Sequence, residues 1–138
     1  MSIYLNSDKA YENFKCLYGS RYYVDKSFII EKLNELINTS DRYICITRPR
    51  RFGKTLNISM LQYFFEDAYD NFNNKDKDNS YLFKGLNIMH AGENYIKHIG
   101  KYPVINLSLK SAKQGTYELA YISLKRRIAE EFQRHEHI

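Results

Sequence analysis

The tripeptide Gly53-Lys54-Thr55 is the part of the sequence whose residue types and spacing best fit a chemical role. In phosphate-binding loops the pattern Gly-x4-Gly-Lys-Ser/Thr lies between a strand and a helix. Positions 48–55 match this pattern at these three residues and depart from it at the first glycine, where Arg48 stands. Because Pro49 favours an extended conformation at the residue before it, we expect the strand to continue through Arg48 and the loop to turn afterwards.

The chemistry of such a loop explains these residue types. Backbone N–H groups at a helix start have no intrahelical partner, and together with the helix dipole they attract phosphate. Glycine at position 53 permits close approach and a φ that a side chain disfavours. Lys54 would contact the outer phosphates, and the Thr55 hydroxyl would ligate Mg²⁺. The sequence therefore predicts a site for a nucleoside triphosphate and Mg²⁺, made of Arg50, Arg51, Phe52, Gly53, Lys54, Thr55 and Leu56, with Thr55 as the metal ligand.

The charge distribution agrees with an anionic ligand but leaves its class open. The chain of 138 residues has a net charge of +5. Five cations and no acid lie between positions 42 and 54, namely Arg42, Arg48, Arg50, Arg51 and Lys54. Such a cluster suits either a nucleotide or a nucleic acid. A nucleic-acid or partner-binding module with a degenerate phosphate loop is therefore the alternative function.

The elements around the loop predict an α/β fold. Apolar residues at helical spacing predict a helix over 27–38, with Asp25 as its N-cap, a second from Thr55 and a third over 116–132. Two apolar runs, 42–47 and 102–109, predict buried strands, and the polar tract 70–80 predicts a loop. The order of helices and strands favours a three-layer arrangement around a mainly parallel sheet.

The length fits a single domain. We divide it into a lead-in and first helix over 1–41, the strand, phosphate loop and helix over 42–66, and a loop, second core strand and C-terminal helix over 67–138. The two cysteines, Cys16 and Cys45, are expected to be buried free thiols. Because the sequence has no apolar run of membrane-spanning length and no secretory signal at its start, we expect a cytoplasmic protein.

Four segments, in order along the chain, resemble the bacterial AAA-ATPase-like family. They are Tyr22-Tyr-Val-Asp-Lys-Ser27, Ile46-Thr-Arg-Pro-Arg-Arg-Phe-Gly-Lys-Thr-Leu-Asn-Ile-Ser-Met60, Leu82-Phe-Lys-Gly-Leu86 and Gly100-Lys-Tyr-Pro-Val-Ile-Asn-Leu-Ser-Leu109. In that family Arg48 in place of the first glycine is the usual form. The resemblance implies a P-loop NTPase domain of AAA-like type, ATP as the nucleotide, and phosphate-loop roles for Gly53, Lys54 and Thr55.

Residues that would complete an ATPase are not evident. An acid usually follows a second buried strand and holds Mg²⁺ through water, but the run 104–109 leads into Lys110. Glu66 and Asp67 are expected at a solvated helix end, and His135 and His137 in a solvated tail. The family has its acidic strand beyond the segment that 116–135 resembles, and larger members often carry a C-terminal domain similar to PD-(D/E)XK nucleases. We therefore expect an N-terminal fragment of an ATPase, with weak or absent hydrolysis and unknown catalytic residues. Nucleic acid or a second copy would be further partners.

Overall fold

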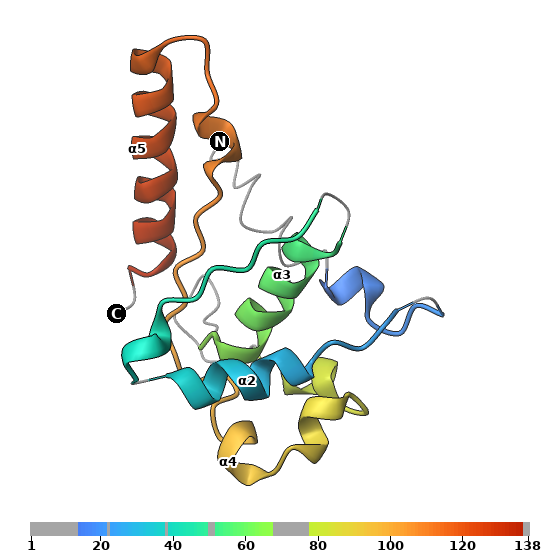
Figure 1. Cartoon of the computed structure of the whole chain (residues 1–138). Helices are drawn as coiled ribbons and strands as arrows, with labels where there is room; N and C mark the ends of the chain where they lie inside the picture. Colours follow the sequence, from blue (N-terminus) through green and yellow to red (C-terminus); the bar gives the residue numbers. More distant parts are fainter. Residues whose placement is uncertain (1–13, 22, 38, 50–51, 68–77, 137–138) are drawn as a thin grey trace.

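Helices and short 3₁₀ helices are the regular elements of the part of the chain that the structure describes. The computed structural model describes residues 14–21, 23–37, 39–49, 52–67 and 78–136. After a helical turn at 14–17, the elements are α2 (Phe28–Leu36), η1 (Ser40–Arg42), α3 (Lys54–Phe65), η2 (Ser80–Phe83), η3 (Asn87–His90), α4 (Glu93–Ile96), η4 (Leu109–Ala112) and α5 (Tyr117–Arg134). Figure 1 shows α2 crossing beside α3, with α5 standing at one side of the molecule.

The core lies where α2, α3, η2 and η3 meet the helical turn at 14–17. Phe83 is fully buried, with its ring centroid 5.4 Å from that of Phe14 and 5.2 Å from that of Phe64. Segments far apart in the sequence therefore share one aromatic cluster. The buried hydrophobic residues are Phe14, Ile30, Met60, Tyr63, Phe64, Leu82, Phe83, Leu86 and Ile88.

The predicted parallel sheet is wrong for the described residues, among which the structure assigns no strand. Residues 43–49 and 103–108 have no regular secondary structure, and the isolated parallel bridge in this part of the chain joins Glu66 to Tyr102. Tyr43 is 82% exposed and Ile105 72% exposed, so the two runs are not buried strands either. Apolar and β-branched residues favour an extended backbone, but a sheet also requires a hydrogen-bonded neighbour.

The path of the chain after α4 explains why the expected second strand, 102–109, does not pair with 42–47. The backbone N–H groups of Gly100 and Tyr102 donate to the carbonyls of Phe64 and Phe65, at 2.8 and 2.9 Å. The N–H of Asp67 donates to the Tyr102 carbonyl at 2.9 Å. These bonds attach the start of the expected second strand to the C-terminal end of α3. The segment then runs beside α5, as the orange trace in Figure 1 shows.

The predicted helices are confirmed, with shifted ends. α2 begins at Phe28 with Ser27 in the N-cap position, so Asp25 is not the cap itself. α3 begins one residue before Thr55, and α5 has Thr116 as its N-cap, whose side chain accepts from the Leu119 N–H. α5 has no buried residue, although the pattern predicted an apolar face.

The predictions for the cysteines, the lead-in and the polar loop have different outcomes. Cys16 and Cys45 are free thiols, as predicted, but both are exposed and the predicted burial is wrong. The expected lead-in falls partly on residues 1–13 and the expected loop partly on residues 70–77, which lie outside the described residues. In the described ranges, no helix combines the length and apolar character needed to cross a membrane.

Candidate functional site

The loop before α3 has the backbone conformation that the motif requires at its glycine. Gly53 is the N-cap residue of α3, with φ 76° and ψ 18°, in the left-handed region. Its carbonyl accepts the first helical bond from the Asn57 N–H at 2.9 Å. A left-handed residue at this point turns the chain sharply into a 12-residue helix. The requirement for glycine at position 53 is therefore conformational, as expected.

Lys54 turns its side chain back over the loop. Its ammonium donates to the Arg48 carbonyl and, at 2.9 Å, to the Pro49 carbonyl. The cation is thus held between the end of the extended segment 43–49 and the first turn of α3. An anion bound at the amino end of α3 would lie beside this ammonium group.

The remaining predicted site residues surround this turn. Thr55 is exposed, Leu56 packs partly buried against the core, and Phe52 is exposed. A β-carbon added at Gly53 would meet no atom within 4 Å, so that side of the loop is open. Arg50 and Arg51 lie outside the described residues.

Replacement of Gly53 by alanine is expected to lower the free energy of unfolding by about 1–2 kcal/mol, because an L-residue is strained in the left-handed conformation. A urea titration of both proteins would measure the difference. Gly115→Ala is the matched control, since Gly115 also has open space around it and no positive φ. Equal stability of the two variants would contradict this account of Gly53.

The segment from Tyr23 to Ser27, part of the first family-like string, has a structural role. Asp25 accepts from the Ser27 N–H at 2.8 Å and, through its second carboxylate oxygen, from the Asn87 N–H at 2.7 Å. The Ser27 hydroxyl oxygen accepts from the Ile88 N–H at 3.0 Å. These bonds fasten the start of α2 to the start of η3. Asp25 thus supports the helix entry without being its cap.

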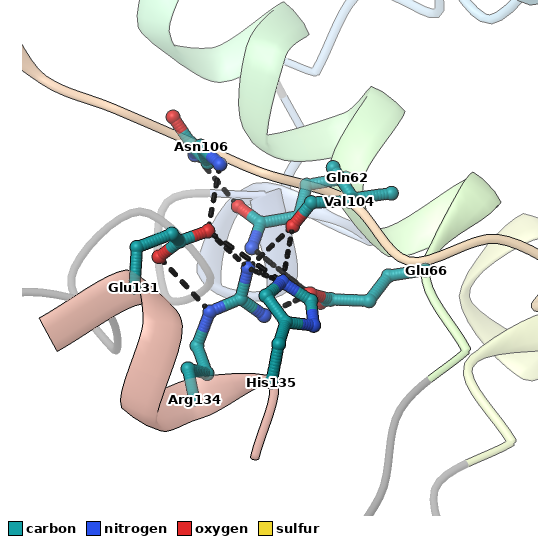
Figure 2. A network of polar contacts seen from close by, with 7 residues as sticks. All are labelled: Gln62, Glu66, Val104, Asn106, Glu131, Arg134 and His135. Atoms are coloured by element: carbon teal, nitrogen blue, oxygen red, sulfur yellow. Dashed lines mark hydrogen bonds and ion pairs between the residues drawn. The ribbon is translucent and has the colours of Figure 1, made fainter. Parts of the chain in front are cut away.

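A second polar cluster joins the far end of α3 to α5, and Figure 2 shows its side chains converging from both helices and the segment between them. Glu66 is 2% exposed and forms an ion pair with Arg134. Arg134 also donates to Glu131 at 2.5 and 3.1 Å and to the Val104 carbonyl at 2.5 Å. One guanidinium therefore connects α3, the segment after α4, and α5.

Two amides complete this cluster. The Asn106 side-chain amide donates to Gln62 Oε1 at 2.7 Å, and its backbone N–H donates to Glu131 at 2.8 Å. The Gln62 amide donates to both Glu66 oxygens, at 3.4 and 3.5 Å. We call Gln62, Glu66, Asn106, Glu131 and Arg134 the α3–α5 network.

The α3–α5 network corrects two expectations. Glu66 is a buried, ion-paired residue and not part of a solvated helix end. His135 is not in a solvated tail, because its Nε2 lies 2.9 Å from the Val104 carbonyl oxygen; His137 lies outside the described residues. The sequence signal for a polar contact there was the spacing of Gln62 and Glu66, two polar residues four positions apart at the end of an apolar run.

The network also shifts the ionisation of its members. Burial by itself raises the pKa of Glu131, but hydrogen bonds from Arg134 and the Asn106 N–H outweigh it and hold that pKa below its usual range. Burial by itself lowers the pKa of Arg134, and the bonds to Glu131 with the charge of Glu66 reverse this and raise it. The charged forms of both side chains are therefore favoured by the fold.

Within the described ranges, no group of three or more His, Cys, Asp or Glu side chains could hold a metal ion. A magnesium ion bound with a nucleotide commonly takes one or two protein ligands and completes its shell with phosphate oxygens and water. The hydroxyl of Thr55, an exposed residue that directly follows Lys54 in sequence, fits that donor set.

Comparison with known proteins gives one match. Residues 10–138 match the AAA-ATPase-like family described as "Predicted AAA-ATPase". No curated protein and no solved structure matches the chain. The matched range includes positions 48–55, the segment 23–27 and the α3–α5 network. Since the family match extends over nearly the whole sequence, the chain belongs to the AAA-ATPase-like family.

Proposed function

We propose that this chain binds ATP together with Mg²⁺ at the loop and first turn of α3. The observation that carries the proposal is the geometry at Gly53 and Lys54. A left-handed glycine opens a 12-residue helix, and the next residue returns its ammonium to the loop carbonyls. Membership of the AAA-ATPase-like family supports ATP as the nucleotide.

The first turn of α3, Lys54 and Thr55 have separate parts in this binding. The N–H groups of the first turn of α3 donate to phosphate oxygens, and the helix dipole adds to their attraction. Lys54 exchanges its carbonyl contacts for charge-assisted bonds to the outer phosphates. Thr55 provides a hydroxyl ligand for Mg²⁺, which neutralises phosphate charge when it is bound. Arg50, Arg51, Phe52 and Leu56 border the same loop in sequence.

Lys54→Ala is expected to weaken binding of a non-hydrolysable ATP analogue by about 10- to 100-fold in the presence of Mg²⁺. The loss corresponds to removing one charge-assisted hydrogen bond. Calorimetric titration of both proteins, with and without Mg²⁺, would measure it. Lys97→Ala is a suitable control because Lys97 is an exposed lysine at the end of α4, away from the loop.

Two outcomes would contradict the proposal. Well-folded protein that binds no nucleotide would remove the phosphate site. Equal binding by the wild type and the Lys54 variant would place any nucleotide elsewhere. In the first case, binding to DNA or RNA that falls steeply with salt would instead support the nucleic-acid alternative.

A further inference from the structure

Two tyrosines of α5 form an exposed and nearly parallel pair. The ring centroids of Tyr117 and Tyr121 lie 6.0 Å apart, with an angle of 14° between the ring planes. Tyr117 is 75% exposed and Tyr121 48% exposed, and α5 stands at one side of the molecule (Figure 1). Because α5 has no buried residue, this pair is separate from the aromatic cluster around Phe83. The two rings therefore present aromatic surface to solvent.

The helix aligns the two rings with a cation. Residues four positions apart lie on one face of a helix, and Tyr117, Tyr121 and Lys125 have this spacing. The Lys125 ammonium lies 5.0 Å from the centroid of the Tyr121 ring, above its face, which is a cation–π contact. The N-cap Thr116 fixes the start of the helix just before Tyr117. We call Tyr117, Tyr121 and Lys125 the tyrosine platform.

Positive charge surrounds the tyrosine platform. Between positions 109 and 127 the sequence has five cations and one acid, namely Lys110, Lys113, Lys125, Arg126, Arg127 and Glu118. Lys110 lies in η4 and Lys113 is its C-cap residue, both are exposed, and η4 packs against α5. Arg126 and Arg127 form ion pairs with Glu130. The lysines are therefore the cations best placed to contact a further anion.

Exposed aromatic rings beside lysines suit a flexible polyanion that carries aromatic groups. Proteins that bind single-stranded DNA or RNA stack successive bases on aromatic side chains while cations contact the backbone phosphates. A duplex keeps its bases paired and stacked on one another, so it offers no free base face to the two tyrosines. The excess of cations favours this polyanion over an uncharged apolar partner.

We infer that the tyrosine platform binds single-stranded nucleic acid, with bases stacked on Tyr117 and Tyr121 and a backbone phosphate at Lys125. Every base has an aromatic face, so the platform should bind with little sequence preference. The site shares no residue with the loop before α3. The inference therefore does not rest on the proposed function.

The test measures the fluorescence anisotropy of a labelled short oligothymidylate titrated with the full chain. A strand of equal length made of abasic sugar-phosphate units carries the phosphates without bases, and a duplex of that length hides them. The variants are Tyr117→Leu, which removes the ring, and Tyr117→Phe, which keeps it. Tyr43→Leu is the matched control, because Tyr43 is 82% exposed and the Arg42 guanidinium lies 5.1 Å from its ring centroid. Circular dichroism would verify that each variant is folded.

Tyr117→Leu is expected to weaken binding of the oligothymidylate by roughly tenfold, the effect of losing one stack between a base and an aromatic ring. Tyr117→Phe and Tyr43→Leu should bind as the wild type does. The abasic strand and the duplex should bind the wild type more weakly than the oligothymidylate. Lys125→Gln should reduce the slope of log K against log salt by about 0.7, the value for one phosphate contact to a single strand.

Three results would overturn the inference. If the wild type binds the oligothymidylate and the abasic strand equally, the bases do not stack on the protein. If Tyr43→Leu weakens binding and Tyr117→Leu does not, the strand lies on the basic segment 42–54. If no oligonucleotide binds, the platform is not a nucleic-acid site, and self-association that Tyr117→Leu abolishes in sedimentation would assign it to a second copy. None of these results bears on whether ATP binds at Gly53 and Lys54.

Discussion

Replacement of Phe83 by alanine is expected to lower the free energy of unfolding by about 3–5 kcal/mol, the usual cost of removing a buried aromatic side chain. Phe83 is fully buried and its ring packs on those of Phe14 and Phe64. The loss includes the transfer free energy of the ring and the cavity left among residues from three separate segments. A urea titration followed by circular dichroism would measure it. Because small domains have about 5–15 kcal/mol in total, the variant should be partly unfolded at elevated temperature.

Phe28→Ala is the matched control for this result. Phe28 lies in the first turn of α2 and is 51% exposed, so its truncation removes less buried area and leaves no enclosed cavity. We expect it to cost about 1 kcal/mol or less, within the range for substitutions outside the core. If both variants lose the same stability, the core does not lie at the junction of α2, α3, η2 and η3.

Arg134→Ala is expected to destabilise the protein by about 3 kcal/mol, because it leaves the carboxylate of Glu66 buried without its ion-pair partner. The Arg134 side chain is 21% exposed and that of Glu66 2%, so water cannot readily replace the lost contact. The variant also loses the bond to the Val104 carbonyl, which attaches α5 to the segment after α4, and the bond to Glu131 within α5. Denaturant titration at neutral pH would give the difference.

Arg126→Ala tests whether burial is the reason. Arg126 forms an ion pair with Glu130 on the same helix, but its side chain is 75% exposed, and exposed pairs contribute about 0–1 kcal/mol. A similar loss in both variants would show that helix charge, and not the α3–α5 network, explains the effect.

The pH dependence of stability should also depend on the α3–α5 network. Since the pKa of Glu131 is lowered in the folded protein, its contribution to stability is present above the unfolded carboxyl pKa of about 4.3 and is lost as the pH falls through the folded value. Without Arg134 that pKa returns toward the ordinary range. The wild type should therefore lose more stability on acidification than Arg134→Ala does.

The three longer helices, α2, α3 and α5, could be predicted from the sequence because their signals are local. Apolar spacing in 28–36, 54–65 and 117–134 fits the helical period, and Gly53 and Thr116 mark two of the starts. Helix periodicity and end residues depend on neighbours within a few positions. The turn at Gly53, which defines the candidate site, belongs to this predictable class.

The lack of strands among the described residues could not be predicted in the same way, because strand pairing is a property of distant segments. The runs 42–47 and 102–109 have the composition of strands, yet the second follows the end of α3 because of the bonds at Gly100 and Tyr102. Neither run by itself shows whether it will pair with another strand or bond to the end of a helix.

The prediction that Glu66 is exposed to solvent was wrong for a related reason. Its sequence neighbours indicate a helix end, and helix ends are commonly solvated. Its burial depends on Arg134, 68 positions further along the chain. A pocket of about 350 Å³ beside Gly53 was also invisible in the sequence, because its lining comes from two separate segments. Leu17, Ser20, Tyr23, Val24 and Lys26 line one side, and Phe52, Gly53, Leu56 and Asn57 line the other.

The attachment of α5 has a consequence for how the molecule opens. None of the residues of α5 is buried, and its last turn holds two members of the α3–α5 network. Regions with few buried apolar contacts exchange their amide hydrogens through openings that cost less than global unfolding. We therefore expect α5 to open together with η4, against which it packs, while the aromatic cluster around Phe83 stays closed. The polar contacts at the last turn of α5 then contribute to the free energy of that opening.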